Sequence, residues 1–388
     1  MSEWKKVRLG DVVLFNPRES IKKGTVVKKI AMDKLAPYTR LITGYEEVPF
    51  SSGTKFRNSD TLMARITPCL ENGKIAQVSI LSKDEIAFGS TEYIVFRNID
   101  GITDSCYVYY FVTSPWFRDI AIKSMVGSSG RQRVQQDVLE NLEVDLPPLA
   151  EQERIAAILG SLDDKIELNN RINKNLEEQA SALFKRWFVD FEFPDTDSKP
   201  YKSAGGKFID SPLGAIPEGW NIEPLGSFVS IISGKRPLQK VVSIDSENLI
   251  PIIGASGVMG YTNSVLLDEN ILVIGRVGTL GVVQRLNGKL WTSDNTLVVK
   301  SRYQEYVYHI LKSIDYKSIN RGSTQPLITQ TDIKNHITIF PKKNILQKFE
   351  SVVACIVNEV EIKKIENVKL AELRDTLLPK LMNNELKL

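Results

Sequence analysis

The sequence predicts an α+β protein in which two similar globular domains are separated by two long antiparallel coiled-coil helices. Three observations predict this fold class. Motifs of the first half recur in the same order in the second half, short β-rich runs fill the first part of each half, and each half continues into a long heptad pattern. At 388 residues the chain is also longer than one typical domain. We therefore expect a pseudo-twofold internal repeat.

The internal repeat consists of matched motifs whose spacing falls from 216 to 194 residues along the chain. Small deletions in the second copy produce such a one-way drift, so the second copy is predicted to be shorter by roughly two dozen residues. The matched motifs are Trp4-x4-Leu9-Gly10 with Trp220-x4-Leu225-Gly226, Arg65-Ile66 with Arg276-Val277, Ser90–Arg97 with Ser293–Lys300, Tyr107–Tyr109 with Tyr306–Tyr308, Gly127, Gln135 and Asp137 with Gly322, Gln330 and Asp332, and Pro147 with Pro341.

The globular part of each copy, residues 1–148 and 217–343, is predicted to be a mixed α+β domain. Runs rich in Val, Ile, Phe and Tyr that are interrupted by Gly, Asn and Pro are typical of short strands. The predicted strands include 75–81 and 93–96 in the first copy and 271–274 and 296–299 in the second, and matching helical stretches are expected at 107–111 and 306–311.

A long helix is predicted after each globular domain, over residues 149–190 and 344–388. Core positions step alternately by four and three from Ile155 to Trp187, and the same register repeats from Phe349 to Leu381, which is a coiled-coil pattern. Two such helices in one chain pair most simply in antiparallel orientation. The intervening residues 191–216 are rich in Pro, Gly, Ser and Asp and are predicted to be a linker.

Both heptad patterns turn polar at matching layers, Asn169 with Asn173 in the first helix and Lys363 with Asn367 in the second. Polar residues in a coiled-coil core fix the register and the number of partners at a cost in stability. The alternative is that the helices bend or face solvent at these layers. The sequence leaves both interpretations open.

Composition and motifs argue against catalysis by this chain. The three cysteines lie far apart without a CxxC pair, which speaks against a disulfide framework or zinc site and favours a reducing cytoplasm. No phosphate-binding Gly-x4-Gly-Lys-[Ser/Thr] motif, signal peptide or membrane-spanning run is present. The two histidines, His309 and His336, stand in unrelated contexts, and His309 replaces Tyr110 of the first copy, which indicates packing. We expect no catalytic residue and no metal site.

Polar and basic residues cluster at matched positions of the two copies and are candidates for DNA contacts. Arginine can bond guanine through two hydrogen bonds, Asn and Gln suit adenine, and Ser, Thr and Lys reach phosphates. The alternative for any single residue is an ordinary solvated loop. The net charge of +3 permits DNA binding without requiring it. The candidates are Arg65, Lys74, Ser90, Thr91, Ser128, Arg131, Gln132 and Arg133 in the first copy and Lys235, Arg236, Arg276, Ser293, Asn295, Arg321, Ser323 and Gln325 in the second.

Two features sharpen this hypothesis. Arg65 and Arg276 each follow an apolar strand and precede a turn that contains glycine. The loops that differ between otherwise similar frames are SGRQRV at 129–134 and TQPLIT at 324–329. One scaffold with two different loops is what recognition of two dissimilar half-sites requires.

Three motifs give the chain a family resemblance. Leu146–Ile155 (LPPLAEQERI) with the heptad helix that follows resembles the central conserved region of Type I restriction-modification specificity subunits, and Leu373–Leu381 (LRDTLLPKL) resembles their C-terminal conserved segment. Pro217–Trp220 (PEGW) resembles the usual entry to their second target-recognition domain. The resemblance spans essentially the whole chain.

The resemblance implies a non-catalytic, cytoplasmic subunit that recognises DNA through two target-recognition domains. Each domain would recognise one half of a bipartite, asymmetric target in double-stranded DNA. Two methyltransferase subunits and the restriction subunits would be the protein partners. Those partners would use S-adenosylmethionine, ATP and Mg, and this chain would bind no cofactor.

Two other functions remain to be distinguished. A duplicated coiled-coil scaffold that binds only proteins would show no salt-dependent affinity for duplex DNA, whereas a DNA-binding subunit loses affinity steeply with salt. A nuclease that acts alone would cut plasmid in the presence of magnesium, although no metal or nucleotide motif supports it.

Overall fold

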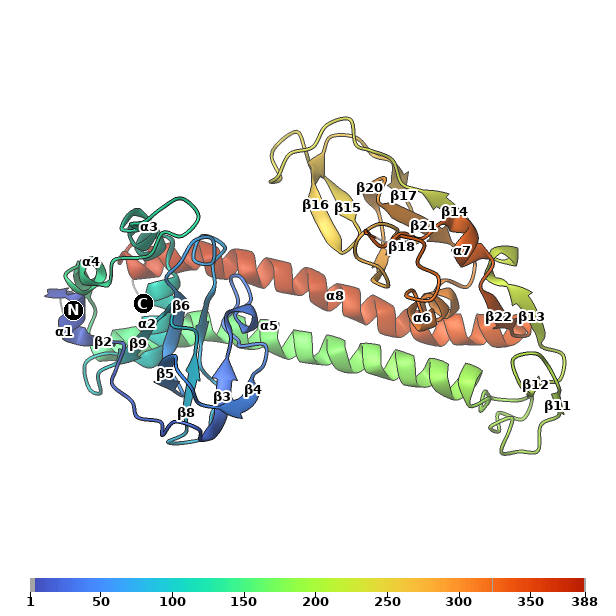
Figure 1. Ribbon diagram of the computed structural model, residues 1–388, viewed down its shortest axis with the longest axis horizontal. Coiled ribbons are helices and arrows are strands. Elements are labelled where there is room, and N and C mark those ends of the chain that lie inside the picture. The colour runs from blue at the N-terminus through green and yellow to red at the C-terminus, as the bar shows by residue number, and fades with distance from the viewer. Residues whose placement is uncertain (1–3, 323, 387–388) are drawn as a thin grey trace. The chain divides into compact units, whose positions relative to one another are not determined.

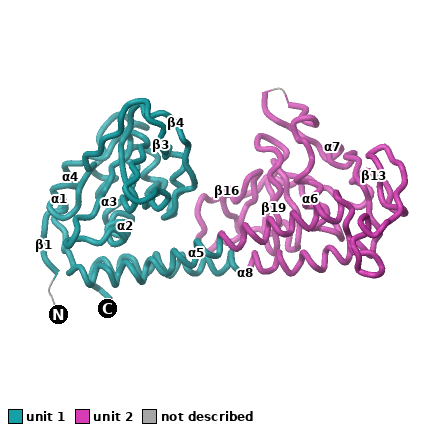
Figure 2. Tube along the Cα trace, turned by 90° about the horizontal axis from the view of Figure 1, so that it is seen from below, with its two compact units in different colours: residues 1–170, 363–388 teal, residues 171–362 magenta. Residues whose placement is uncertain are grey.

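The computed structural model describes residues 4–322 and 324–386 (Figure 1). The chain divides into two compact units, residues 1–170 with 363–388 and residues 171–362 (Figure 2). Each unit combines one globular domain with a stretch of each of the two long helices, α5 (Leu149–Phe184) and α8 (Lys343–Met382).

The globular domain of unit 1 holds two four-stranded sheets, with strand orders β2-β9-β6-β7 and β4-β3-β8-β5, and a separate β1–β10 pair. Within the second sheet, β3 and β8 run parallel. The elements are β1 (Lys5–Arg8), α1 (Leu9–Val12), β2 (Val13–Phe15), β3 (Val26–Ile30), η1 (Met32–Lys34), β4 (Glu46–Pro49), β5 (Thr54–Arg57), β6 (Thr61–Ala64), β7 (Ile75–Gln77), β8 (Ile86–Gly89), β9 (Tyr93–Asn98), α2 (Ser105–Thr113), α3 (Pro115–Lys123), α4 (Gln136–Glu140) and β10 (Glu143–Leu146).

The globular domain of unit 2 repeats this topology, with strand orders β14-β21-β18-β19 and β16-β15-β20-β17 and a separate β13–β22 pair. The counterpart of the parallel pair is β15 with β20. The elements are β13 (Asn221–Pro224), η3 (Leu225–Ser227), β14 (Ser230–Ser233), β15 (Ile250–Gly254), β16 (Gly257–Thr262), β17 (Leu267–Asp268), β18 (Ile271–Gly275), β19 (Val283–Leu286), β20 (Lys289–Thr292), β21 (Thr296–Lys300), α6 (Gln304–Ser313), α7 (Gln330–Lys334) and β22 (Ile337–Phe340).

The strand registers confirm the internal repeat. Ala64 pairs with Tyr93 between β6 and β9, and Gly275 pairs with Thr296 at the corresponding place between β18 and β21. The predicted fold class, α+β with a duplicated domain and two long helices, is therefore confirmed. Helix α3 of unit 1 has no helical counterpart among the described residues of unit 2.

One part of the predicted alignment is off by a residue. The sequence matches place Gln135 with Gln330 and Asp137 with Asp332, 195 residues apart. In the structure α4 begins at Gln136 and α7 at Gln330, 194 residues apart. The shift occurs because the loop after Gly127 is one residue longer than the loop after Gly322, so similar residues fall one position out of register.

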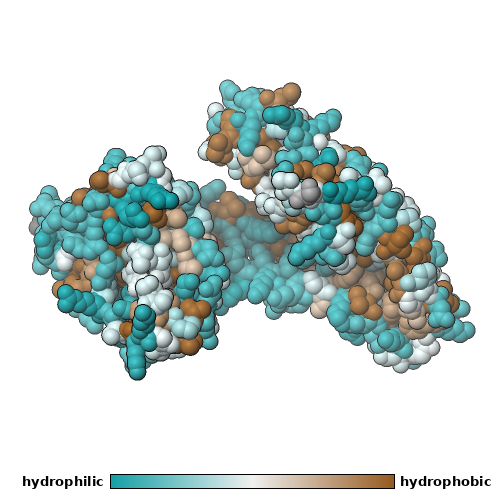
Figure 3. All heavy atoms as spheres, in the orientation of Figure 1, coloured by the Kyte–Doolittle hydropathy of each residue, from teal (hydrophilic) through white to brown (hydrophobic). Residues whose placement is uncertain are grey.

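Each unit has its own hydrophobic core, in which the sheets, the short helices and the long helices meet. In unit 1, Tyr109 and Tyr110 of α2 pack with Ile155 and Leu159 of α5 and with Leu381 of α8. The unit 2 core is built the same way from Tyr306 and Tyr308 of α6, Phe184 of α5, and Phe349 and Val353 of α8. The face of unit 1 in Figure 3 is mostly hydrophilic, as expected when the apolar side chains are used in these cores.

The long helices pair in antiparallel orientation within each unit, because contacts that advance along α5 retreat along α8. In unit 1, the Arg374 Nη1 donates to Asp163 Oδ1 at 2.6 Å, and further along α5 the Asn169 Nδ2 donates to Asn367 Oδ1 at 2.8 Å. Asn169 has no exposed surface. This polar layer therefore lies inside the helix interface and not on a solvent-facing bend.

Buried polar contacts attach each globular domain to the long helices of its own unit. In unit 1, the hydroxyl of Tyr110 donates to Asp163 Oδ2 at 2.7 Å. In unit 2, Arg285 donates from Nη1 to Glu177 on α5 at 2.8 Å and from Nε to Glu305 at 2.9 Å, while its guanidinium lies 3.4 Å from the centre of the Tyr308 ring. These contacts fix how each domain sits on its own stretch of helix.

The segment between the copies, residues 191–216, is an ordered part of unit 2. After a π-helical turn at the end of α5 (η2, Lys185–Val189), Phe193 stacks on Tyr201 at 4.6 Å and on Trp220 at 4.8 Å. The short strands β11 (Phe208–Ile209) and β12 (Ile216–Pro217) then pair antiparallel. The segment has the composition of a linker, but its aromatic residues also hold it in place.

Candidate nucleic-acid interface

Arg65 lies directly after β6 and is held by main-chain hydrogen bonds on both sides. Its N–H donates to the carbonyl of Glu92 at 2.9 Å, and its own carbonyl accepts from the N–H of Val134 at 2.8 Å. The guanidinium is half-buried, and its Nη2 donates to the Val134 carbonyl at 3.1 Å. Its Nε is buried and has no hydrogen-bond partner among the described residues.

Arg276 repeats this arrangement in unit 2. Its N–H donates to the carbonyl of Asn295 at 2.9 Å, and its carbonyl accepts from the N–H of Ile328 at 2.9 Å. Its Nη1 lies 3.5 Å from the hydroxyl of Ser233, and its Nε is again buried and without a partner among the described residues. The internal repeat therefore preserves the backbone frame around the arginine as well as the residue itself.

The two guanidinium groups keep most of their donors available. An arginine side chain carries five N–H donors and a permanent positive charge, so a half-buried one without a carboxylate partner favours an anionic or acceptor-rich ligand. In residues 4–322 and 324–386, no carboxylate forms an ion pair with Arg65 or with Arg276. A phosphate oxygen or the acceptor edge of guanine satisfies this requirement.

The other two arginines of the frames, Arg133 and Arg321, are already paired. Arg133 bonds both carboxylate oxygens of Glu92 at 2.7–3.0 Å, and Arg321 Nε donates to Asp332 at 2.8 Å. Hydrogen bonding from Arg133 holds the pKa of Glu92 below its ordinary value. These two arginines therefore shape their loops, and DNA contacts from them would have to compete with the carboxylates.

The loops that follow are small hairpins with exposed tips. Val126 and Arg133 bridge at the base of the first hairpin, and Arg321 donates its N–H to the Leu327 carbonyl at 2.9 Å in the second. Ser128, Arg131 and Gln325 are exposed, and Gln132 is half-buried, with its N–H donated to the Thr67 hydroxyl at 3.1 Å. Ser323 lies outside the described residues.

Ser90 and Thr91 follow β8 and line a hollow of about 580 Å³ in the globular domain of unit 1. The Ser90 hydroxyl accepts from the N–H of Glu92 at 3.1 Å, and Thr91 is exposed. Lys74 instead turns to the main chain, and its Nζ donates to the carbonyl of Met32 at 2.9 Å. The structure brings the serine and threonine to one surface and gives the lysine a partner of its own.

The remaining candidates of unit 2 fall into exposed and buried groups. Lys235 and Arg236 are exposed on the loop after β14, where the Lys235 carbonyl accepts from Trp291 Nε1 at 2.7 Å. Asn295 is also exposed. Ser293 is only 1% exposed and its hydroxyl is buried, so this structure does not present it to a ligand.

Lys29 lines the same hollow as Ser90 and was missed by the sequence analysis. It lies beside Phe88 in the parallel β3–β8 pair, 3.7 Å from the carboxylate of Glu46. Its counterpart in the β15–β20 pair is the apolar Ile252. Matching of the two copies therefore gives no signal at this position.

His309 has a packing role, as its exchange for Tyr110 indicates. Its ring stacks on Phe184 at 4.8 Å, and burial lowers its pKa to about 3. Within the described part of the chain, no group of three or more His, Cys, Asp and Glu side chains is placed to hold a metal ion. No helix in that part is long and apolar enough to cross a membrane.

Comparison with known proteins bears on both globular domains. The family of Type I restriction modification DNA specificity domains matches residues 1–178 and 217–370. A Type I restriction enzyme specificity subunit, MjaIX, from Methanocaldococcus jannaschii is 28% identical over 75% of this chain and 72% of its own length. The HindI specificity subunit from Haemophilus influenzae is 24% identical over the full length of both chains.

A solved structure has the same fold. The S subunit of a Type I restriction-modification system from M. genitalium aligns with a TM-score of 0.58 and 14% sequence identity, over 97% of this chain and 96% of its own. The likeness covers the duplicated globular domains and both long helices.

Proposed function

Because the chain belongs to the family of Type I restriction-modification DNA specificity proteins, we propose that its two globular domains each recognise one half of a bipartite, asymmetric target in double-stranded DNA. Arg65 contacts one half-site and Arg276 the other. The loops 127–132 and 322–326 supply the contacts that differ between them.

The observation that carries this proposal is the repeated arginine with unused donors. Both arginines are fixed at the main chain through their own N–H and carbonyl groups, so binding does not have to order the backbone at these positions. Both have a buried Nε without a partner in the described residues. Acceptors on the DNA can pair with the Nη donors of each guanidinium that have no partner in the described residues.

The asymmetry of the target follows from what surrounds each arginine. Beside Arg65 stands the ion pair of Glu92 with Arg133. The backbone hydrogen bonds place neutral Asn295 and apolar Leu327 at the corresponding positions beside Arg276. A carboxylate such as that of Glu92 accepts from cytosine N4, whereas an amide such as that of Asn295 pairs with adenine. The two domains therefore hold their arginines in the same backbone arrangement but select different bases beside them.

The chemistry belongs to partner subunits under this proposal. The chain is a non-catalytic subunit that joins two methyltransferase subunits and the restriction subunits on one DNA target. S-adenosylmethionine, ATP and Mg are bound by those partners and not by this chain. Equilibrium dialysis of the isolated chain against each compound should show no binding at concentrations that saturate the assembled complex.

The deciding experiment is expression of this chain with a methyltransferase subunit of its own system in a host that lacks adenine methylation. Sequencing of the host genome for modified adenine should reveal one split motif with a fixed spacer. The same methyltransferase expressed without this chain is the control. Absence of a split motif, with a methyltransferase shown to be active, would contradict the proposal.

A further inference from the structure

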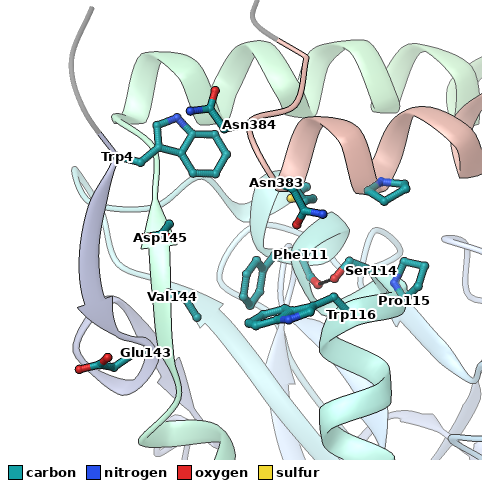
Figure 4. Close-up of a pocket in the computed structure, with 12 residues that line it drawn as sticks. Trp4, Phe111, Ser114, Pro115, Trp116, Glu143, Val144, Asp145, Asn383 and Asn384 are labelled. Carbon is teal, nitrogen blue, oxygen red and sulfur yellow. Dashed lines mark hydrogen bonds between the residues drawn. The ribbon is translucent and has the colours of Figure 1, made fainter.

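The loop between β14 and β15 of unit 2, residues 234–249 (Figure 1), exposes one apolar side chain almost completely. Leu238 is 94% exposed. By contrast, Trp116 of unit 1 is 46% exposed, and its ring packs against that of Phe111 at a cavity beside α8 (Figure 4). A single exposed leucine is ordinary on a protein surface, so its surroundings decide what it does.

The tip of this loop, residues 236–240, is fixed at both ends. At one end, the N–H of Lys235 donates to the carbonyl of Thr292 at 2.8 Å. At the other end, Val241 and Tyr261 exchange main-chain hydrogen bonds of 3.0 and 2.9 Å. The tip is therefore a short projection held by the sheet, and its apolar side chain is presented from a constrained backbone.

The loop begins beside the arginine that recognises DNA under the proposed function. Ser233 is the last residue of β14, and its hydroxyl lies 3.5 Å from Arg276 Nη1. Leu238 follows Ser233 by five residues, which span at most about 18 Å. Base pairs follow one another at about 3.4 Å along the duplex. Leu238 thus meets DNA within about five base pairs of the base that Arg276 contacts.

The residues around Leu238 are basic. Lys235, Arg236 and Lys240 are exposed, and within residues 4–322 and 324–386 no carboxylate forms an ion pair with any of them. Cations free of carboxylate partners are suited to DNA phosphates. DNA-binding proteins insert apolar side chains, leucine among them, between base pairs, which unstacks the step and bends the duplex. A leucine between phosphate-binding cations has the composition of such a wedge.

The corresponding loop of unit 1, residues 16–25, is shorter and half-buries its one isoleucine. Strand pairing places Phe15 with Ile231, 216 residues apart, and Lys29 with Ile252, 223 residues apart. The loop of unit 2 is therefore seven residues longer, although the second copy is the shorter one overall. The exposed leucine is thus a feature of one domain and not of the shared frame.

We propose, on the basis of the proposed function, that Leu238 is a wedge that enters the base stack in the half-site recognised by unit 2. Arg236 and Lys240 contact the flanking phosphates. The wedge unstacks one base step and bends the duplex there. Pyrimidine–purine steps such as TA and CA unstack most easily, so the wedge selects sequence at a step where no hydrogen bond identifies a base. The half-site of unit 1 is bound without this distortion.

The test uses the full chain in complex with its methyltransferase and a duplex that carries the methylated split motif. 2-Aminopurine, which fluoresces more strongly when it is unstacked, replaces one base at a time in both half-sites, except at the methylated adenines and their neighbours. Wild type should raise the fluorescence at least about threefold at one step of the unit 2 half-site. Leu238→Ser should abolish this increase and Leu238→Met should keep it. Leu249→Ser, at a 58% exposed leucine of the same loop, is the matched control and should leave it unchanged.

The outcomes separate the wedge from the proposed function. If the complex methylates the split motif but no step shows an increase that depends on Leu238, the wedge is overturned and the proposed function stands. If no split motif is methylated, both fail. Loss of the methyltransferase from the purified Leu238→Ser complex would show that the tip contacts protein, and would overturn the assignment to DNA.

A second measurement tests the flanking cations. Arg236→Ala with Lys240→Ala should reduce the slope of log affinity against log salt concentration by about 2, because two phosphate contacts are lost. Lys334→Ala with Lys312→Ala removes two positive charges from α6 and α7 of the same unit and is the control for net charge. Equal slopes for the tip variant and the wild type would overturn the phosphate contacts of the tip.

Discussion

At the scale of single residues, the feature that connects fold to function is an arginine fixed by its own backbone. A side chain in a flexible loop loses conformational entropy when it binds, and that loss weakens affinity. Arg65 and Arg276 avoid much of this cost, because hydrogen bonds to their N–H and carbonyl groups tie them to neighbouring segments. Under the proposed function, each of them contacts a single half-site.

Replacement of Arg276 should therefore affect one half of the target only. Arg276→Ala should weaken binding to the full target by about 1–3 kcal/mol, the usual contribution of a bidentate base contact, and Arg276→Lys should restore little because an ammonium cannot form that fork. Fluorescence anisotropy with duplexes in which either half-site is scrambled measures this. Once the matching half-site is scrambled, wild type and variant should bind alike, and equal losses at both half-sites would contradict the assignment.

A second residue-scale prediction concerns Glu350. Its carboxylate accepts from the N–H groups of Glu305 and Tyr306 at 3.1 and 2.8 Å, yet burial outweighs these bonds and raises its pKa to about 7. A carboxyl whose pKa is higher in the folded state than in the unfolded state binds more protons when folded. Its contribution to stability is therefore complete at acidic pH and is lost as pH rises through about 7.

Glu350→Gln should remove this pH dependence while keeping one acceptor for the α6 N-terminus. Relative to the variant, the wild-type free energy of unfolding should fall by about 1–2 kcal/mol between pH 5 and pH 8. Urea denaturation at both pH values measures the difference. Glu372→Gln, at an exposed position of the same helix, is the matched control. Parallel pH profiles for wild type and Glu350→Gln would show that the carboxyl titrates normally.

At the scale of elements, the polar layer of unit 1 is the informative feature of the paired helices. Asn169 is fully buried and donates to Asn367 and to Glu366, while its own Oδ1 has no partner among the described residues. An apolar layer at this depth gives more stability, so the asparagine contributes to register and not to affinity between the helices.

The double replacement Asn169→Leu with Asn367→Leu should accordingly stabilise the chain but make the pairing of α5 with α8 less specific. We expect an increase of about 1–2 kcal/mol in the free energy of unfolding, together with a larger fraction of dimers or higher assemblies than in the wild type. Light scattering after size-exclusion chromatography detects these. The exposed replacement Lys174→Leu controls for added hydrophobicity. A double variant that is less stable and assembles no more than the wild type would show that the layer supports folding alone.

Local patterns predicted these elements well wherever the pattern extends over many residues. The heptads located both long helices because dozens of positions share one period, and the repeat located Arg65 and Arg276 because both strands and turns recur. The burial of Ser293 was not visible, because it depends on how β20 and β21 pack within the sheets. Lys29 was also missed, since its neighbours on β8 are distant in sequence.

At the scale of the whole molecule, duplication means that one domain can be changed without the other. Exchange of residues 217–343 for those of a relative with another target should alter one half of the methylated motif and leave the other half unchanged. The methylated sequence in a host without adenine methylation measures this. An exchange within 1–148 should alter the other half. A change of both halves by either exchange would show that the domains are not independent.

Unit 1 is built from both extremes of the sequence, residues 1–170 with 363–388. During synthesis its globular domain is translated before unit 2, yet Leu378 and Leu381, which complete its core, are translated after unit 2. Unit 2 is one continuous stretch of the chain, so all of its residues are available once residue 362 has been translated. A chain that stops short of residue 363 thus contains a complete unit 2 and an unfinished unit 1 with apolar surface exposed. Such a product is a natural substrate for chaperones and proteases, so the folding order itself discriminates against incomplete subunits.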